Sequence, residues 1–427
     1  MTLRRSNRAT RIDYAALNES HIIHERNVHP HIPEFQKFAK SQISNSNNND
    51  IILIDENYNT KFTDDNLAKI IETTKLSKPI LIRGANPQVP ETYNENIKLN
   101  FNIPNYNIEK YTQLIGSNVK VPVMDTMTQN NSRNWDMLKW CNYFSSETHD
   151  KIRNVISLEI SQTKLGSQIN VPRVVENIDI IRELYNDPKF AKLLLENEID
   201  PPKVQKYILM SVRNCFTDFH IDFAGTSVYY SLVKGHKQFI LLPPTNDNLR
   251  AYKAWCLSDI QQHLWFPSTV KNNGILIDVK PGDLLLLPSL WIHAVHTLDD
   301  SIIIGGNFLN AHSLDNHIRA HKLETETCVP DQFRFPNLLR FMWLIAYYYY
   351  LKKPTNELEL NAYKSVVNFL NDEWLFVKNS NLKRGAITKL KAAVPRNIIG
   401  DPQEFLNLAN ASIDDEAEPI RKKIRKN

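Results

Sequence analysis

The sequence predicts an α+β fold in which a rolled antiparallel sheet is flanked by helices. Between residues 217 and 307, short apolar runs are separated by Gly and Pro turns, a pattern typical of antiparallel strands. Six of the eleven glycines fall in this stretch, and such a density of turns favours a sheet that closes on itself. After residue 307 the apolar spacing becomes helical, which predicts a C-terminal helical lobe.

The first 50 residues are polar, with an arginine-rich start and a serine and asparagine run at 44–49. They cannot bury enough apolar surface to fold alone, so we expect much of this segment to be mobile. It contains four histidines, His21, His24, His29 and His31. Nothing apolar or cysteine-rich surrounds them in the sequence to shape a site, so we do not expect them to bind a metal.

The next hundred residues are expected to support the sheet. Apolar alternation predicts strands at 51–54, 79–83, 119–124 and 154–160. A helix is predicted near 65–74 and another at 135–144, where Trp135, Leu138 and Trp140 could anchor it to the core. Between 245 and 273 the chain is polar and helical, which indicates an insertion between strands.

Residues 217–222 carry two metal-ligand side chains at strand spacing. Side chains at i and i+2 of a strand lie on one face, so the His220 imidazole and the Asp222 carboxylate can point into one cavity. His293 lies about 70 residues further on, on another predicted strand that a rolled sheet could bring to the same cavity. His296, three residues later, faces the opposite side of that strand, so only one of the two can belong to the site, and the Trp-Ile-His-Ala-Val context of residues 291–295 selects His293.

Two histidines and one carboxylate leave coordination positions open on a bound ion. Non-haem Fe(II) oxygenases use this arrangement, and a zinc hydrolase could use the same ligands. Lys237 alternates with apolar neighbours on the following strand, so we expect its ammonium group inside the barrel, where it needs an anionic partner. A dicarboxylate cosubstrate would supply that partner, which favours the oxygenase.

These residues carry a resemblance to a known family. The stretch 217–307 resembles the JmjC domain of 2-oxoglutarate-dependent histone demethylases, and among them the family that acts on methylated lysine 36 of histone H3. Similarity extends through 154–159, 203–207 and 305–309, and covers residues from about 80 to about 345. The opening residues look like the segment that follows a PHD finger in fungal members, whereas this sequence contains no such finger.

The resemblance implies a double-stranded β-helix, the jelly roll of cupin-like JmjC barrels, with flanking helices. We expect a JmjC catalytic region at 51–310, with its barrel core at about 200–310. Around it we expect a mobile basic and polar segment at 1–50, a helical lobe at 311–410 and a charged tail at 411–427. Apolar spacing predicts lobe helices at 335–351, 358–376 and 387–393.

The resemblance also implies a role for each site residue. The ligands of Fe(II) would be His220, Asp222 and His293. Residues matching the cosubstrate pocket are Thr217 and Lys237 for the distal carboxylate of 2-oxoglutarate, together with Tyr230, Asn154 and Asn307. O2 would be the second cosubstrate.

Two positions depart from the family pattern. Ala224 and Leu290 stand where the family usually has glycine, and the leucine could shift the loop that leads to His293. We expect metal binding to survive both replacements and turnover to be affected.

The implied function is oxidative demethylation of mono- or dimethylated lysine on histone H3, at lysine 36, with release of formaldehyde, succinate and CO2. The implied partner is the histone H3 tail or the nucleosome, and the implied location is the nucleus. Two alternatives remain open: a hydroxylase of a non-histone protein would use the same ligands, and a scaffold that binds chromatin without catalysis would need none of them.

Charge and cysteine content limit the remaining classes. The net charge of +4 is too small to indicate nucleic-acid binding by the whole chain. Basic clusters at 4–11 and 421–426 suit nuclear import or weak contact with DNA, and a solvated tail would explain either cluster equally well. Four scattered cysteines predict neither a zinc finger nor a disulfide scaffold. The most apolar stretch, 341–351, is about half a membrane span, so we expect no membrane contact.

Overall fold

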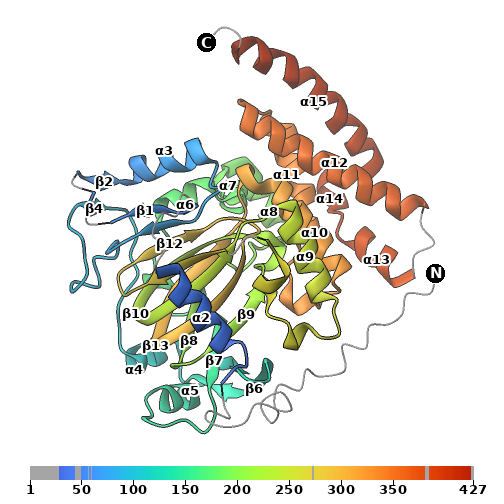
Figure 1. Cartoon of the computed structure of the whole chain (residues 1–427). Coiled ribbons are helices and arrows are strands. Elements are labelled where there is room, and N and C mark those ends of the chain that lie inside the picture. The colour runs from blue at the N-terminus through green and yellow to red at the C-terminus, as the bar shows by residue number, and fades with distance from the viewer. Residues whose placement is uncertain are drawn as a thin grey trace.

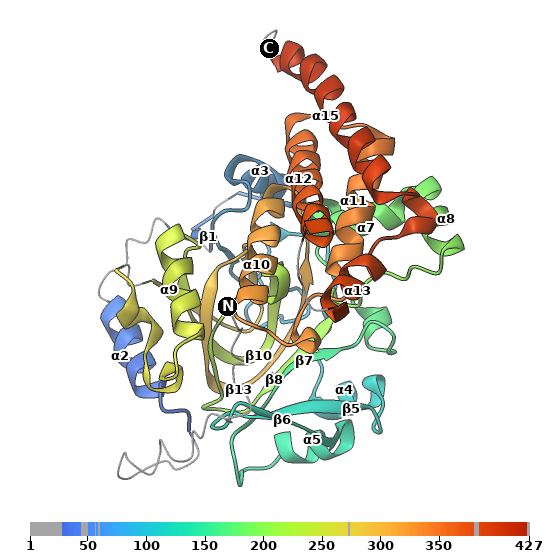
Figure 2. The same ribbon diagram turned by 90° about the vertical axis from the view of Figure 1, so that its right-hand side faces the viewer.

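A computed structural model describes residues 28–43, 50–55, 57–58, 60–271, 274–379 and 384–424 of the chain. The curved sheet lies at the centre of the molecule, and the C-terminal helices, in orange and red, form a layer beside it (Figures 1 and 2). Strands and helices that precede the barrel in sequence cover its other sides (Figure 1).

Two long strands form the backbone of the sheet. β10 (Ser227–Leu242) and β13 (Ile292–Phe308) pair antiparallel over most of their length. Four shorter strands extend this pair: β8 (Tyr207–Ser211) and β9 (Phe216–His220) beside β13, and β11 (Ile275–Val279) and β12 (Leu284–Leu287) beside β10. The predicted α+β class, with a rolled antiparallel sheet of jelly-roll type, is confirmed.

A bulge in β10 decides which of its side chains face inward. The pairing with β13 shifts between Leu232 and Lys237. Gly235 lies in this bulge at φ 88°, where a Cβ atom would overlap the carbonyl oxygen of Asp300. Even-numbered residues such as Tyr230 face the cavity before the bulge, and odd-numbered residues such as Lys237 face it afterwards. The bulge therefore places Tyr230 and Lys237 on one face although they stand an odd number of positions apart in the sequence.

The supporting strands and the first predicted helix are confirmed. The sheet continues through β1 (Ile52–Ile54), β3 (Ile80–Ile82), β5 (Lys120–Asp125), β6 (Asn130–Asp136) and β7 (Arg153–Glu159). β2 (Phe62–Thr63) and β4 (Ile97–Lys98) form a separate small pair. The helices of this part are α3 (Asp64–Thr74), α4 (Ile108–Ile115), α5 (Met137–Phe144), α6 (Arg173–Ile178), α7 (Ile180–Asn186), α8 (Pro188–Glu196) and α9 (Asn246–Cys256).

The helix predicted at 135–144 differs from the observed one. Trp135 belongs to β6, and α5 begins two residues later, after the Asp136 side chain accepts a hydrogen bond from the Lys139 amide. Trp140 is fully buried as predicted, whereas Leu138 is 51% exposed and anchors nothing. The strand β6 was not predicted, because its polar residues do not alternate with apolar ones.

Part of the N-terminal segment is ordered, contrary to the expectation for residues 1–50. Residues Ile32–Ile43 form α2, which lies against the barrel (Figure 1). Ile32, Phe35 and Ala39 recur at helical spacing and are buried against strands β10 and β13. The helix therefore depends on docking and need not fold alone. Residues 1–27 and 44–49 lie outside the described part of the chain.

The C-terminal lobe consists of helices packed around an apolar core. Its helices are α10 (Leu314–Glu326), α11 (Leu338–Lys352), α12 (Glu357–Asn379), α13 (Arg384–Ala392), α14 (Arg396–Ile399) and α15 (Pro402–Ile424). The three predicted helices correspond to α11, α12 and α13. The charged tail expected from 411 is instead a continuation of α15, which buries Phe405, Ala409 and Ile413 along one face.

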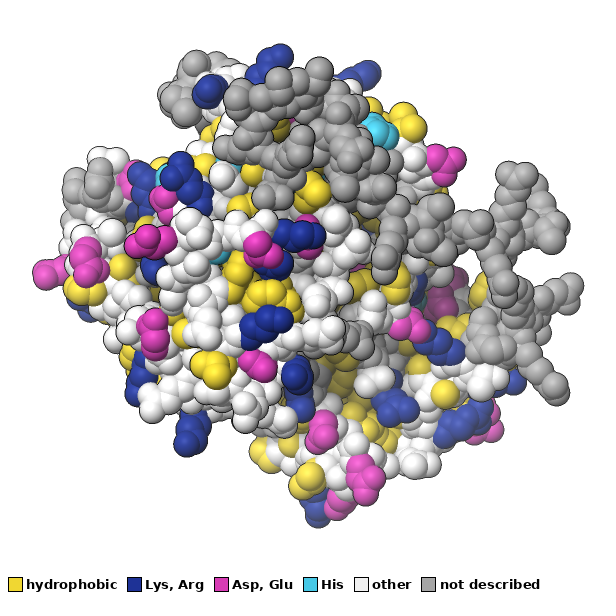
Figure 3. All heavy atoms as spheres, turned by 90° about the horizontal axis from the view of Figure 1, so that it is seen from below, with side chains coloured by type: hydrophobic (Ala, Val, Ile, Leu, Met, Phe, Trp, Pro, Cys, Tyr) yellow, Lys and Arg dark blue, Asp and Glu magenta, His cyan; other side chains and the backbone are white. Residues whose placement is uncertain are grey.

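The surface agrees with the small net charge. On the face seen from below, basic and acidic side chains are interspersed over the described residues (Figure 3). None of the described helices is long and apolar enough to span a membrane.

Candidate active site

His220, Asp222 and His293 meet at the edge where β9 pairs with β13. His220 ends β9 and lies directly opposite His293 in the antiparallel register, with ring centroids 4.1 Å apart. Asp222 follows with extended backbone, and its Oδ2 lies 3.8 Å from the Nε2 of His293. One ligand atom from each of the three residues lies within 4.8 Å of the others. The structure therefore brings the predicted triad together.

Backbone carbonyls orient both imidazoles. The Nδ1 of His220 donates to the carbonyl oxygen of Asp218 at 2.8 Å, and the Nδ1 of His293 donates to that of Trp291 at 3.0 Å. Because each proton is then on Nδ1, each Nε2 keeps a lone pair. The Nε2 of His293 is buried and has no hydrogen-bond partner among the described residues. These are the features of ligands prepared for a metal ion.

The protonation states also fit a metal ion. Burial lowers the pKa of His220 and of His293 to about 4, so both imidazoles are neutral near pH 7. Burial raises the pKa of Asp222 to about 6, against the opposing effects of His220 and of a hydrogen bond from Asn307. Two neutral imidazoles and a carboxylate together suit a divalent cation.

The two departures from the family pattern lie on either side of the triad. Ala224 has φ 49° and Leu290 has φ 64°, the left-handed region that glycine adopts without strain. Each non-glycine residue there costs about 1–2 kcal/mol. Leu290 offsets this cost through burial, since its side chain is 1% exposed. The loop before His293 keeps that histidine opposite His220.

The triad opens onto a cavity of about 620 Å³ between the barrel and the C-terminal lobe. All eight candidate residues line this cavity: Asn154, Thr217, His220, Asp222, Tyr230, Lys237, His293 and Asn307. Glu324 and Arg334, from α10 and the segment after it, line it as well. The cavity therefore combines a candidate metal site with polar groups from two parts of the fold.

A chain of hydrogen bonds links Lys237 to Thr217. The Nζ of Lys237 donates to the Oγ of Ser211 at 2.8 Å, and this hydroxyl donates to the Oδ1 of Asn154 at 2.7 Å. The Nδ2 of Asn154 lies 3.4 Å from the Oγ1 of Thr217. Sequence reasoning missed Ser211, because the serine meets Asn154 only through the pairing of β7 with β8.

Lys237 is a buried cation without a carboxylate partner among the described residues. Its side chain is 4% exposed, and burial lowers its pKa to about 8, so it is mostly protonated at pH 7. A buried ammonium group is costly unless an anion pairs with it. The prediction that Lys237 faces the barrel interior is therefore met, and the cavity suits an anionic ligand.

Tyr230 and Asn307 complete the wall beside the triad. Tyr230 packs against Phe239, with ring centroids 5.9 Å apart. The Nδ2 of Asn307 donates to the Oγ1 of Thr226 at 2.8 Å. Both side chains are buried, one supplying apolar surface and the other a fixed amide.

The chain is similar to known proteins over most of its length. Residues 71–311, which include all eight candidate residues, match the Cupin-like domain family. The chain is 37% identical over 367 residues to the JmjC domain-containing histone demethylation protein 1 of Debaryomyces hansenii, a match that spans 82% of this chain and 67% of the relative. The protein of the same name from Candida albicans is 38% identical over 362 residues, 81% of this chain and 70% of the relative. That of Candida glabrata is 37% identical over 328 residues, 76% of each chain.

Proposed function

Because the chain belongs to the cupin-like JmjC family of fungal histone demethylation proteins, we propose that it is an Fe(II)- and 2-oxoglutarate-dependent dioxygenase that demethylates lysine on histone H3. The single observation that carries this proposal is the meeting of two neutral histidines, one aspartate and a buried lysine, which has no carboxylate partner in the described part of the chain, in one cavity. A metal ion that binds an oxo-acid needs both parts, a ligand set with open positions and a cation for the distal carboxylate.

The chain's own residues would divide the work as follows. His220, Asp222 and His293 would hold Fe(II). Lys237 would pair with the distal carboxylate of 2-oxoglutarate, and Thr217 would donate a hydrogen bond to it. When bound, Fe(II) with 2-oxoglutarate and O2 supplies the oxidation of an N-methyl group, with release of succinate, CO2 and formaldehyde.

The hydrogen-bonded chain behind Lys237 would fix the cosubstrate. Ser211 accepts from the ammonium group and donates to Asn154, so Lys237 is held in one position before any ligand arrives. Tyr230 and Phe239 would exclude water from the same end of the cavity, which strengthens the ion pair. Asn307 would support the carboxylate of Asp222 through its side-chain amide.

The substrate would enter between the barrel and α10. Glu324, on α10, accepts a hydrogen bond from the Ala224 amide through Oε1 at 2.7 Å. Its other oxygen is buried and has no hydrogen-bond partner among the described residues. A carboxylate at the wall of the cavity favours a cationic substrate, and methylated lysine is cationic.

We extend the proposal to the mono- and dimethylated forms of lysine 36 of histone H3, on the family resemblance of the stretch 217–307. The partner would then be the histone H3 tail or the nucleosome, in the nucleus. The basic clusters at 4–11 and 421–426 would add weak contact with DNA.

The test is incubation of the purified chain with Fe(II), 2-oxoglutarate and a panel of methylated histone peptides, followed by peptide mass and formaldehyde. We expect loss of methyl groups from the peptide that carries lysine 36, and much less loss with the Lys237→Met variant when 2-oxoglutarate is limiting. Peptides that gain oxygen and keep their methyl groups would favour a protein hydroxylase. Bound iron without any turnover would favour a non-catalytic chromatin scaffold.

A further inference from the structure

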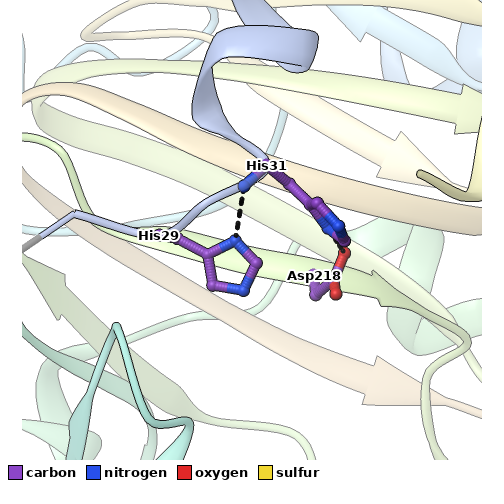
Figure 4. Close-up of side chains that lie close together, drawn as sticks. All are labelled: His29, His31 and Asp218. Atoms are coloured by element: carbon purple, nitrogen blue, oxygen red, sulfur yellow. Dashed lines mark hydrogen bonds and ion pairs between the residues drawn. The ribbon is translucent and has the colours of Figure 1, made fainter. Parts of the chain in front are cut away.

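A second group of two histidines and one aspartate lies beside the cavity. His29 and His31 stand just before α2, and Asp218 lies on β9, two residues before the candidate iron ligand His220. One ligand atom from each of the three residues lies within 4.8 Å of the others. Figure 4 shows the side chains converging from these two segments. Asp218 borders the cavity, whereas neither histidine lines it.

The spacing of His31 and Asp218 suits a shared ion. The Nδ1 of His31 lies 3.4 Å from the Oδ1 of Asp218, longer than the charge-assisted hydrogen bond of about 2.7–2.9 Å. Two ligand atoms on a tetrahedral zinc ion, with bonds of about 2.0–2.1 Å, stand about 3.3 Å apart. His31 is 4% exposed, and its Nε2 is buried without a hydrogen-bond partner among the described residues.

Aromatic side chains from distant parts of the sequence fix both rings. His29 stacks on Phe216 with a centroid distance of 4.6 Å, and His31 meets the edge of Trp265 at 5.7 Å. His29 is fully buried. The expectation that nothing shapes a site was wrong for His29 and His31, because it considered only their sequence neighbours, and His21 and His24 lie outside the described residues.

A simple ion pair explains only part of this arrangement. A contact between His31 and Asp218 would satisfy the carboxylate without any metal. It leaves unexplained why a second histidine is buried with a nitrogen within reach of the same carboxylate. The Nδ1 of His29 accepts the His31 amide at 3.2 Å (Figure 4), and this contact would open if the imidazole bound an ion through Nε2.

We propose that His29, His31 and Asp218 bind a structural Zn²⁺ ion that fastens α2 to β9. Nitrogen and carboxylate ligands in a buried, fixed arrangement are those that zinc accepts. The ion would also steady the strand that orients a catalytic residue, because the carbonyl of Asp218 accepts the Nδ1 proton of His220 at 2.8 Å. This site does not depend on the proposed demethylase activity.

The test counts zinc in the full chain. Protein stripped with a chelator is titrated with Zn²⁺ alone, dialysed and analysed for metal by mass spectrometry. We expect two retained equivalents in the natural chain, one in His31→Ala and one in His293→Ala. His236→Ala is the matched control: it removes a partly exposed histidine that also pairs with an aspartate, Asp278, and should retain both equivalents.

A second variant guards against misfolding. Asp218→Asn keeps the size of the side chain and one acceptor oxygen but removes the anionic ligand, and circular dichroism checks that the variants fold. We expect Zn²⁺ to raise the melting temperature of His293→Ala and not that of the double variant His293→Ala with Asp218→Asn. If His31→Ala and Asp218→Asn each retain two equivalents, or if His293→Ala retains none, His29, His31 and Asp218 do not bind zinc. Demethylase assays play no part in this count, so it can fail while the proposed function stands.

Discussion

The two clusters of His and Asp found among the described residues offer the same types of ligand side chain and share the strand β9, yet their surroundings differ. The cluster around His293 opens onto a cavity of about 620 Å³ that also contains the buried cation Lys237. The cluster around His31 is closed in by aromatic rings, among them Phe216 and Trp265. The ligand set selects a metal, and the space and charge beside it determine whether a substrate can reach that metal.

Removing one ligand from each cluster should lower turnover to very different extents. His293→Ala should lower turnover by more than about 100-fold, because a lost ligand costs more than the 10- to 100-fold typical of residues that only support ligands. His31→Ala should stay within about 10-fold of the natural chain, since it supports the site only through Asp218. Steady-state assays of formaldehyde release measure both. Equal losses in the two variants would remove the distinction between the clusters.

Lys237→Met should weaken 2-oxoglutarate binding. A hydrogen bond to a charged group contributes about 1.5–3 kcal/mol, which corresponds to a rise in Kd of about 10- to 100-fold. Metal content should not change, because Lys237 is not a ligand. Lys234→Ala is the matched control, since Lys234 lies on the same strand and is exposed. Calorimetric titration with 2-oxoglutarate measures the effect, and similar values for the two variants would place the carboxylate elsewhere.

Acid should destabilise the metal-free chain. Six of the described histidines have pKa values lowered to about 4: the buried His29, His293, His296 and His317 and the half-buried His220 and His321. In the unfolded chain these histidines bind protons below about pH 6.5, whereas in the folded chain they do not. The free energy of unfolding therefore falls as the pH is lowered from about 6.5 to 4. Asp179 and Asp222, with pKa values raised to about 7 and 6, act in the opposite direction, and the histidines outnumber them.

Urea denaturation of chelator-treated protein at pH 7.5 and pH 5 measures this loss. The midpoint should be lower at pH 5, and bound metal should reduce the difference at pH values where the ligands stay deprotonated. An unchanged midpoint would mean that these histidines are not held neutral.

Ser211→Ala should have a smaller effect than Lys237→Met. The hydroxyl links Lys237 to Asn154, and loss of one such hydrogen bond costs about 1 kcal/mol, so the Kd for 2-oxoglutarate should rise about fivefold. The matched control is Ser231→Ala, because Ser231 is also a buried serine but lies on β10 and not on β8. A larger loss from Ser231→Ala than from Ser211→Ala would contradict this role.

Ala224→Gly should have the smallest effect. Glycine relieves the left-handed strain of about 1–2 kcal/mol, and its greater freedom in the unfolded chain offsets about 0.5–1 kcal/mol of that gain. The free energy of unfolding should therefore rise by no more than about 1.5 kcal/mol, as measured by denaturation. A clear loss of stability would show that the alanine methyl group packs better than its strained backbone suggests.

Strand periodicity and the family resemblance together predicted the residues at the centre of the candidate site. The spacing of His220, which ends β9, and Asp222, which follows it on extended backbone, allows both side chains to reach one site, and the inward position of Lys237 followed from its apolar neighbours. That Tyr230 and Lys237 share that face could not be predicted, because the bulge at Gly235 reverses the alternation. The face to which each side chain of a strand points can be predicted from the sequence until a bulge changes the register.

Contacts between distant segments were less predictable. Ser211 joins the site only because β8 pairs with β7, and His31 meets Asp218 across almost 190 residues of chain. In contrast, the buried residues Phe405, Ala409 and Ile413 of α15 follow a helical spacing that was available in the sequence and was obscured by the surrounding charges.

The most direct test of the central claim is a calorimetric titration of 2-oxoglutarate into the full chain under anaerobic conditions, with and without Fe(II). The natural chain should bind one equivalent, and binding should weaken strongly when Fe(II) is omitted, in His293→Ala and in Lys237→Met. Binding of equal strength in all four cases would contradict a metal ion held by His220, Asp222 and His293 beside a lysine that pairs with the cosubstrate.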